Sequence, residues 1–148
     1  MAGMVENHSL AFRAAQTHVE FYANESDLMT QHGEVMDCRD CEDFLRLGID
    51  AFHWISRADE ALRSAEYDGG SDEAARLDLA LDGLYKGWQR PCECARKWIQ
   101  LQVAKGHSPG NLREFQECCE EVEDRVQRRD WEHRSRRART ENFSGEEW

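Results

Sequence analysis

Hydrophobic residues recur at three- and four-residue steps along most of the chain, which is the spacing of helices with one buried face. The clearest example is residues 37–65, where Asp37 is a suitable N-cap and Gly69 and Gly70 mark the end. Its apolar stripe consists of Cys41, Phe44, Leu45, Gly48, Phe52, Ile55, Leu62 and Ala65. The opposite face is polar throughout. We therefore expect one long amphipathic helix around which the rest of the chain is organised.

Further stretches with the same period predict helices at residues 9–24, 71–89, 91–105 and 111–139. Pro91 is well placed in the first turn of a helix, so we expect a boundary there. No stretch alternates as a strand does. The sequence predicts an all-α fold: an antiparallel helical bundle of about five helices, two long and three shorter. Residues 1–139 form this single domain, and residues 140–148 form a flexible acidic C-terminal tail.

Helix lengths suggest how the elements are arranged. At about 1.5 Å per residue, the helix from residue 37 and the last helix each span about 43 Å, and the two between them about 25 and 22 Å. Short connections reverse the direction at each step, so the two long helices should be antiparallel. The arginines of the last helix would then lie beside the acidic start of the first long helix. These acids are Asp37, Asp40, Glu42 and Asp43.

The net charge of −11 is unevenly distributed. Residues 1–124 contain 25 acidic and 12 basic residues, whereas residues 125–139 contain seven arginines and two acidic residues. The acidic body argues against non-specific binding to nucleic acid or anionic lipid. The chain has neither an apolar run of roughly 18 residues nor an N-terminal secretory signal. We therefore expect a cytoplasmic protein without a membrane partner, whose six cysteines are thiols or metal ligands.

The cysteine spacing raises the question of a metal site. Cys38-x-x-Cys41 and Cys92-x-Cys94 both lie at expected helix starts, and four thiolates can bind zinc. The expected layout separates the two pairs by about 15 Å. We therefore favour packing roles and predict no metal or cofactor, with a metal-binding bundle using Cys38 and Cys41 as an alternative. Cys119 continues a core stripe, so packing is the expectation there too.

One short motif suggests an enzyme. Arg128 and His133 are five positions apart, which resembles the arginine-x4-to-6-histidine motif of HEPN-type ribonucleases, a family of helical bundles. The resemblance implies that the pair would position and cleave an RNA phosphodiester. It covers two residues, and Arg129 stands where the family usually has a small polar residue. A HEPN-like ribonuclease is therefore an alternative function.

No complete catalytic set is present in the sequence. We interpret the chain as a non-catalytic protein-binding module, or a small regulator or inhibitor, acting through an acidic helical surface that carries tryptophans. Tryptophan and arginine are enriched at protein interfaces. The candidate partner-binding residues are Trp54, Trp131, Arg128, Arg129, Arg136 and Arg137. The expected partner is a protein, for example a basic or nucleic-acid-binding one. Binding of nucleic acid through residues 125–139 is a weaker alternative, and self-association of the chain is also left open.

Overall fold

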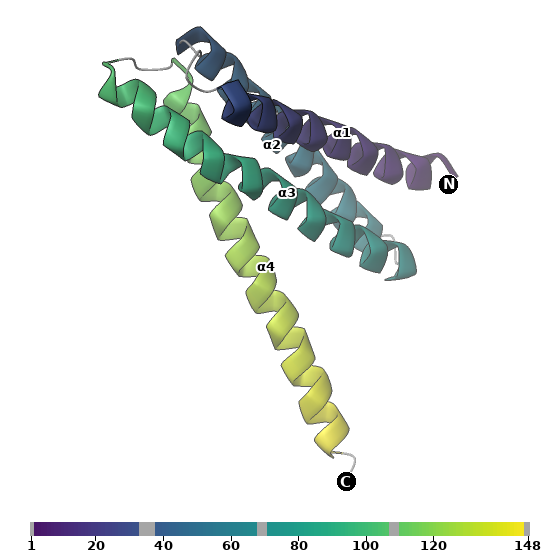
Figure 1. The fold of residues 1–148 in the computed structure, drawn as a ribbon. Coiled ribbons are helices and arrows are strands. Elements are labelled where there is room, and N and C mark those ends of the chain that lie inside the picture. The colour runs from purple at the N-terminus through teal and green to yellow at the C-terminus, as the bar shows by residue number, and fades with distance from the viewer. Residues whose placement is uncertain (1, 33–37, 68–70, 107–109, 147–148) are drawn as a thin grey trace.

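The protein is described by a computed structural model that covers the chain apart from residues 1, 33–37, 68–70, 107–109 and 147–148. The described residues form four helices: α1 (Ala2–His32), α2 (Cys38–Tyr67), α3 (Ser71–Ala104) and α4 (Leu112–Glu146). They contain no strand, so the predicted all-α class is confirmed. Each helix runs back in the opposite general direction from the one before it (Figure 1). A search of the described helices finds none with the length and apolar content needed to span a membrane.

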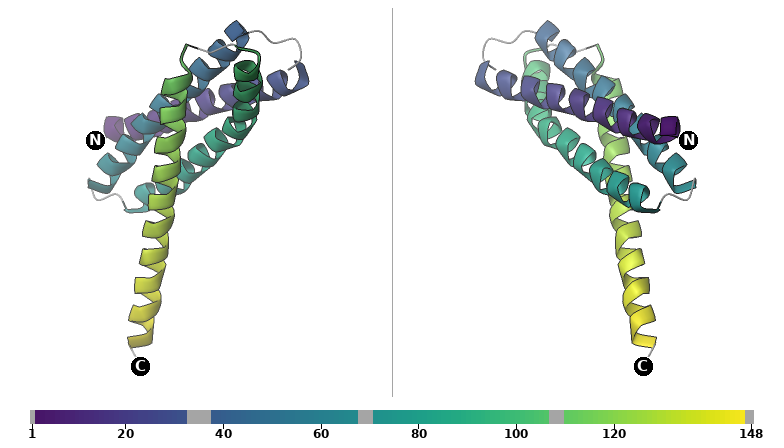
Figure 2. Two further views of the ribbon diagram at one scale, coloured as in Figure 1. Left: turned by 90° about the vertical axis from the view of Figure 1, so that its left-hand side faces the viewer. Right: turned by 90° about the vertical axis from the view of Figure 1, so that its right-hand side faces the viewer.

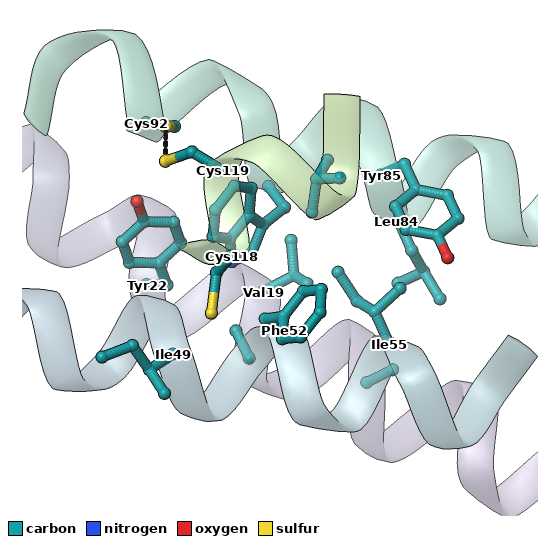
Figure 3. Packing of buried hydrophobic residues seen from close by; sticks show 14 of the residues in the cluster. Val19, Tyr22, Ile49, Phe52, Ile55, Leu84, Tyr85, Cys92, Cys118 and Cys119 are labelled. Atoms are coloured by element: carbon teal, nitrogen blue, oxygen red, sulfur yellow. Dashed lines mark hydrogen bonds between the residues drawn. The ribbon is translucent and has the colours of Figure 1, made fainter. Parts of the chain in front are cut away.

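The core lies between α1, α2, α3 and the first half of α4, and the predicted apolar stripes supply it. Trp88 of α3 is at its centre, with Tyr22, Phe52 and Phe115 contributed by the other three helices. The ring centroids of these residues lie 5.8–6.3 Å from that of Trp88. Figure 3 shows part of this cluster, where residues of all four helices interdigitate. Periodicity therefore predicted which face of each helix is buried.

The predicted boundary at Pro91 is wrong, because α3 is one helix that contains this proline. Proline inside a helix removes a backbone hydrogen bond and costs about 3 kcal/mol. Here Pro91 is itself buried, and Trp88 and Cys92 on either side of it are 1% and 4% exposed. Burial of these side chains against α1, α2 and α4 offsets the cost. Two short predicted helices are thus one long helix of 34 residues.

This continuity also reverses the expected direction of the last helix. With one connection fewer, α4 runs parallel to α2 rather than antiparallel to it. Two contacts demonstrate this: Asn111 donates to the Glu42 carbonyl at 3.0 Å, and Arg125 donates to Ser56 Oγ at 3.0 Å. The arginines therefore do not lie beside the acidic start of α2. That start is next to the beginning of α4, where the Gly110 N–H also donates to Glu42 Oε1 at 2.9 Å.

Two helices extend beyond their predicted limits. The buried face of α1 continues past residue 24 through Ser26 and Met29, which are 3% and 6% exposed. At the other end of the chain, α4 continues to Glu146. The predicted acidic tail, residues 140–148, therefore begins within α4. Residues 147 and 148 and the expected N-cap Asp37 lie outside the described residues.

Candidate functional site: the arginine-bearing half of α4

The second half of α4 projects away from the other three helices (Figures 1 and 2). Its first half is anchored in the core by four buried side chains: Phe115, Cys118, Cys119 and Val122. Beyond Val126, which is half-buried, no side chain of the described part of α4 is buried. A helix end that leaves the body in this way exposes its polar side chains to a partner.

Arg125 follows the last buried side chain of α4 and holds the helix to the bundle. Its Nη1 donates to Ser56 Oγ at 3.0 Å and lies 3.4 Å from the Tyr85 hydroxyl, and its Nε donates to Glu121 at 2.9 Å. The guanidinium carbon is 5.0 Å from the Phe52 ring centroid, within cation–π distance. One arginine thus joins α4 to both α2 and α3.

The Tyr85 hydroxyl extends this network to α2. It donates to Asp59 Oδ2 at 2.8 Å. Burial of the ring and the neighbouring Asp59 carboxylate raise the pKa of Tyr85 from 10.0 to about 12. The phenol therefore keeps its proton, and its donor role, throughout the neutral range.

One helical turn further along, Arg129 and His133 bind two aspartates of α3. Arg129 Nε donates to Asp82 Oδ1 at 2.9 Å, and its Nη2 donates to Asp78 Oδ1 at 2.8 Å and to the Asp78 carbonyl at 2.9 Å. His133 Nε2 is 2.9 Å from Asp78 Oδ2. The two aspartates and the two basic residues are each four positions apart, so each pair shares a helix face. The Arg129 side chain is only 13% exposed.

Asp78, Asp82 and His133 also offer a set of possible metal ligands, with atoms all within 4.8 Å of one another. The guanidinium of Arg129 contacts both carboxylates and already supplies the positive charge that a cation would bring. We therefore interpret the cluster as an interhelical ion pair.

The alternative metal site predicted from the sequence uses Cys38 and Cys41. Cys41 is fully buried, while the Cys38 side chain lies outside the described residues. That alternative stays a prediction.

The opposite side of α4 faces away from the bundle. We call this side the outer face and define it by four exposed residues: Gln127, Trp131, Arg134 and Ala138. Their spacing keeps them on one face of the helix, opposite Arg129 and His133. Arg128 stands at the edge of this face and also lines a cleft against the bundle. Trp131 is 67% exposed, which is rare for so large an aromatic side chain. This exposed tryptophan with flanking arginines is the clearest candidate for a contact surface on α4.

A polar cleft of about 390 Å³ lies between the end of α2, the start of α3 and α4. Five arginines and four acidic residues line it, among them Arg63, Arg128 and Arg136 and the acids Glu66 and Glu132. Because the two signs offset each other, the cleft has no strong preference for an anion.

The structure does not bring the six predicted partner-binding residues together. Trp54 lies on α2, half-buried, with the His18 ring stacked on it at 4.9 Å and Arg57 4.4 Å from its centroid. Arg129 is directed into the bundle, while Arg136 and Arg137 lie on other sides of α4 from Trp131. Of the six, only Trp131 lies on the outer face, with Arg128 at its edge.

The ribonuclease pair is also separated. Arg128 is exposed and lines the cleft, whereas the His133 imidazole is directed towards Asp78 and Asp82. The HEPN-like activity stays a prediction, and its two residues do not share a site.

The sequence analysis did not identify Asp78 and Asp82, the two aspartates that bind Arg129 and His133. Their four-residue spacing, matched by that of Arg129 and His133, was the available signal.

Comparison with known proteins assigns no family to this chain: no protein-family model, no curated protein and no solved structure matches it.

Proposed function

We propose that the protein is a non-catalytic protein-binding module and that the outer face of α4 is its docking surface. The observation that carries the proposal is Trp131, which is 67% exposed on the side of α4 that faces away from the bundle. Exposed tryptophans and arginines are the residues that most often dominate the free energy of protein association. Desolvation of the indole against a partner would supply most of the affinity.

The inner side of the same helix supports the docking role by holding α4 in place. Arg125 and Arg129 are engaged with α2 and α3 through hydrogen bonds of 2.8–3.0 Å to Ser56, Asp78 and Asp82. A binding element that is already ordered loses less conformational entropy on association. The base of the projecting helix is therefore pre-organised for a partner.

The charges around Trp131 favour a protein over nucleic acid. Four exposed arginines lie between residues 126 and 138, but the exposed acids Asp130 and Glu132 precede and follow Trp131 in the sequence. Arg129 is neutralised by Asp78 and Asp82. Affinity for nucleic acid depends on many unopposed phosphate contacts, and the acidic body repels a polyanion. The best fit is a protein with an apolar pocket for the indole and carboxylates at its rim.

The proposal is tested by affinity capture from extract of the source organism, treated with nuclease, with wild type, Trp131→Ala and Tyr67→Ala as baits. Tyr67 is the matched control because it is an aromatic residue, 92% exposed, at the end of α2. Circular dichroism confirms that each bait is folded.

We expect a defined protein to be retained by wild type and Tyr67→Ala and lost with Trp131→Ala. Its direct binding to wild type should weaken at least tenfold in the Trp131→Ala variant, measured with both proteins purified. Equal retention by all three baits would contradict the proposal, as would loss of all binding on nuclease treatment. Recovery of this chain alone would instead show that the face binds a second copy.

A further inference from the structure

Two cysteines from different helices meet at the junction of α3 and α4. The sulfurs of Cys92 and Cys119 are 2.9 Å apart, and the dashed line in Figure 3 marks this contact. Both side chains are buried, at 4% and 8% exposure. In Figure 3 the neighbouring Cys118 directs its sulfur away from the pair. The sulfurs have only to approach from 2.9 Å to the disulfide length of about 2.05 Å.

The two thiols are electrostatically unequal. The hydrogen bond from Cys92 lowers the pKa of Cys119, and the Arg96 guanidinium lowers it further. The same hydrogen bond, together with burial, raises the pKa of Cys92. Burial raises the pKa of Cys118 to about 12. Cys119 is therefore the member of this group that becomes a thiolate, with the Cys92 S–H as its donor. The thiolate is the nucleophilic form of cysteine.

A cavity gives access to Cys119. It has a volume of about 400 Å³ and is lined by Arg96, Ile99, Gln100, Phe115, Gln116, Cys119 and Glu120. Neither Cys92 nor Cys118 lines it. A small reagent entering here reaches Cys119 first, and Arg96 and Glu120 on the wall offer counter-charges to one that carries both carboxylate and ammonium groups, as oxidised glutathione does.

We propose that Cys119 and Cys92 form a reversible dithiol–disulfide site that exchanges with small disulfides of the glutathione type. The Cys119 thiolate attacks one sulfur of the reagent disulfide, and the other sulfur leaves as a thiolate that takes up a proton. Cys92 then loses its proton and attacks the Cys119 sulfur of the mixed disulfide, releasing the second reagent thiol. The protein loses two hydrogens, and one reagent disulfide becomes two thiols. The new bond ties α3 to α4.

This inference is independent of the proposed function, because Cys92 lies in α3 and Cys119 in the anchored half of α4. The covalent link should raise the thermal midpoint of the wild-type protein by about 5–10 °C, since a closed loop between residues 92 and 119 restricts the unfolded chain.

The first test uses the unaltered protein. Reduced wild type is exposed to iodoacetamide under native conditions, and the modified residues are identified by tandem mass spectrometry. Cys119 should be labelled at least tenfold faster than Cys118 and Cys41, which serve as internal controls. Equal labelling of Cys118 and Cys119 would overturn the proposal.

The second test uses oxidised glutathione. Wild type should form a Cys92–Cys119 disulfide, Cys92→Ser should accumulate a mixed disulfide at Cys119, and Cys119→Ser should form neither. Cys118→Ser is the matched control and should behave as wild type. A disulfide through another cysteine, or no mixed disulfide in Cys92→Ser, would contradict the mechanism. Dithiothreitol should reverse the modification and the thermal shift.

Discussion

The indole Nε1 of Trp88 donates a 2.8 Å hydrogen bond to the backbone carbonyl of Gly48. The bond joins the centre of α3 to the centre of α2 in the most buried part of the core. The missing side chain of Gly48 leaves room for two rings that pack around Trp88: a Cβ at this position would lie 2.8 Å from Phe115 Cε2 and 3.0 Å from Tyr22 Cε1.

Gly48→Ala should therefore destabilise the protein although alanine is the better helix former. The methyl group would displace two buried aromatic rings, and such overpacking typically costs 1–3 kcal/mol. Gly83→Ala in α3 is the matched control, because a Cβ there meets nothing within 4 Å. It should stabilise the protein by about 0.5–1 kcal/mol. Urea unfolding measures both. Stabilisation by Gly48→Ala would show that the helices are not packed as described.

Arg129→Gln should reduce the free energy of unfolding by about 1–3 kcal/mol. It leaves Asp78 and Asp82, whose side chains are 20% and 31% exposed, without their main counter-ion. The control is Arg134→Gln, which removes the same charge from the outer face and should change stability by less than about 0.5 kcal/mol. Chemical denaturation at neutral pH compares the two. Equal effects would mean that the ion pair does not hold α4 to α3.

Tyr85 should make stability depend on alkaline pH. Its folded pKa, about 12, exceeds the unfolded value of 10.0. Below pH 10 both states keep the proton and this contribution is complete. Between pH 10 and 12 only the unfolded state releases it, so the free energy of unfolding falls. The fall due to this group is about 2–3 kcal/mol.

The comparison variant is Tyr85→Phe, which has no phenol to titrate. It should be less stable by about 1 kcal/mol at pH 7, because the Asp59 carboxylate loses its donor. Its stability should decline less steeply than that of wild type above pH 10. Thermal unfolding at a series of pH values provides the measurement, and parallel curves for the two proteins would disprove the role of Tyr85.

Helix faces were predictable from the sequence because burial imposes a period on a single helix. The stripes through Phe12 and Tyr22, Phe44 and Ile55, and Phe115 and Val122 are all buried as expected. The relation between helices was not predictable in the same way. The relative direction of two helices depends on how many times the chain reverses between them. A reversal was predicted at Pro91, but α3 continues through this residue, with Trp88 and Cys92 buried on either side.

The same error accounts for what was missed at the candidate site. Arg129 was identified from the sequence, but its partners were expected at the start of α2. With α4 parallel to α2, they are instead Asp78 and Asp82 near the start of α3. The contact between Cys92 and Cys119 depends on the same layout. Of the two tryptophans chosen as contact residues from the sequence, Trp131 is exposed, whereas Trp54 is half-buried beneath His18.

The most direct test of the docking role is amide hydrogen exchange of the purified protein alone and bound to the partner retained by affinity capture. Most residues between 126 and 138 are exposed, so the exchange of their amides should slow at least tenfold in the complex, with little change along α1. Protection of α1 or α2 with residues 126–138 unchanged would contradict the assignment of the outer face of α4 as the binding surface.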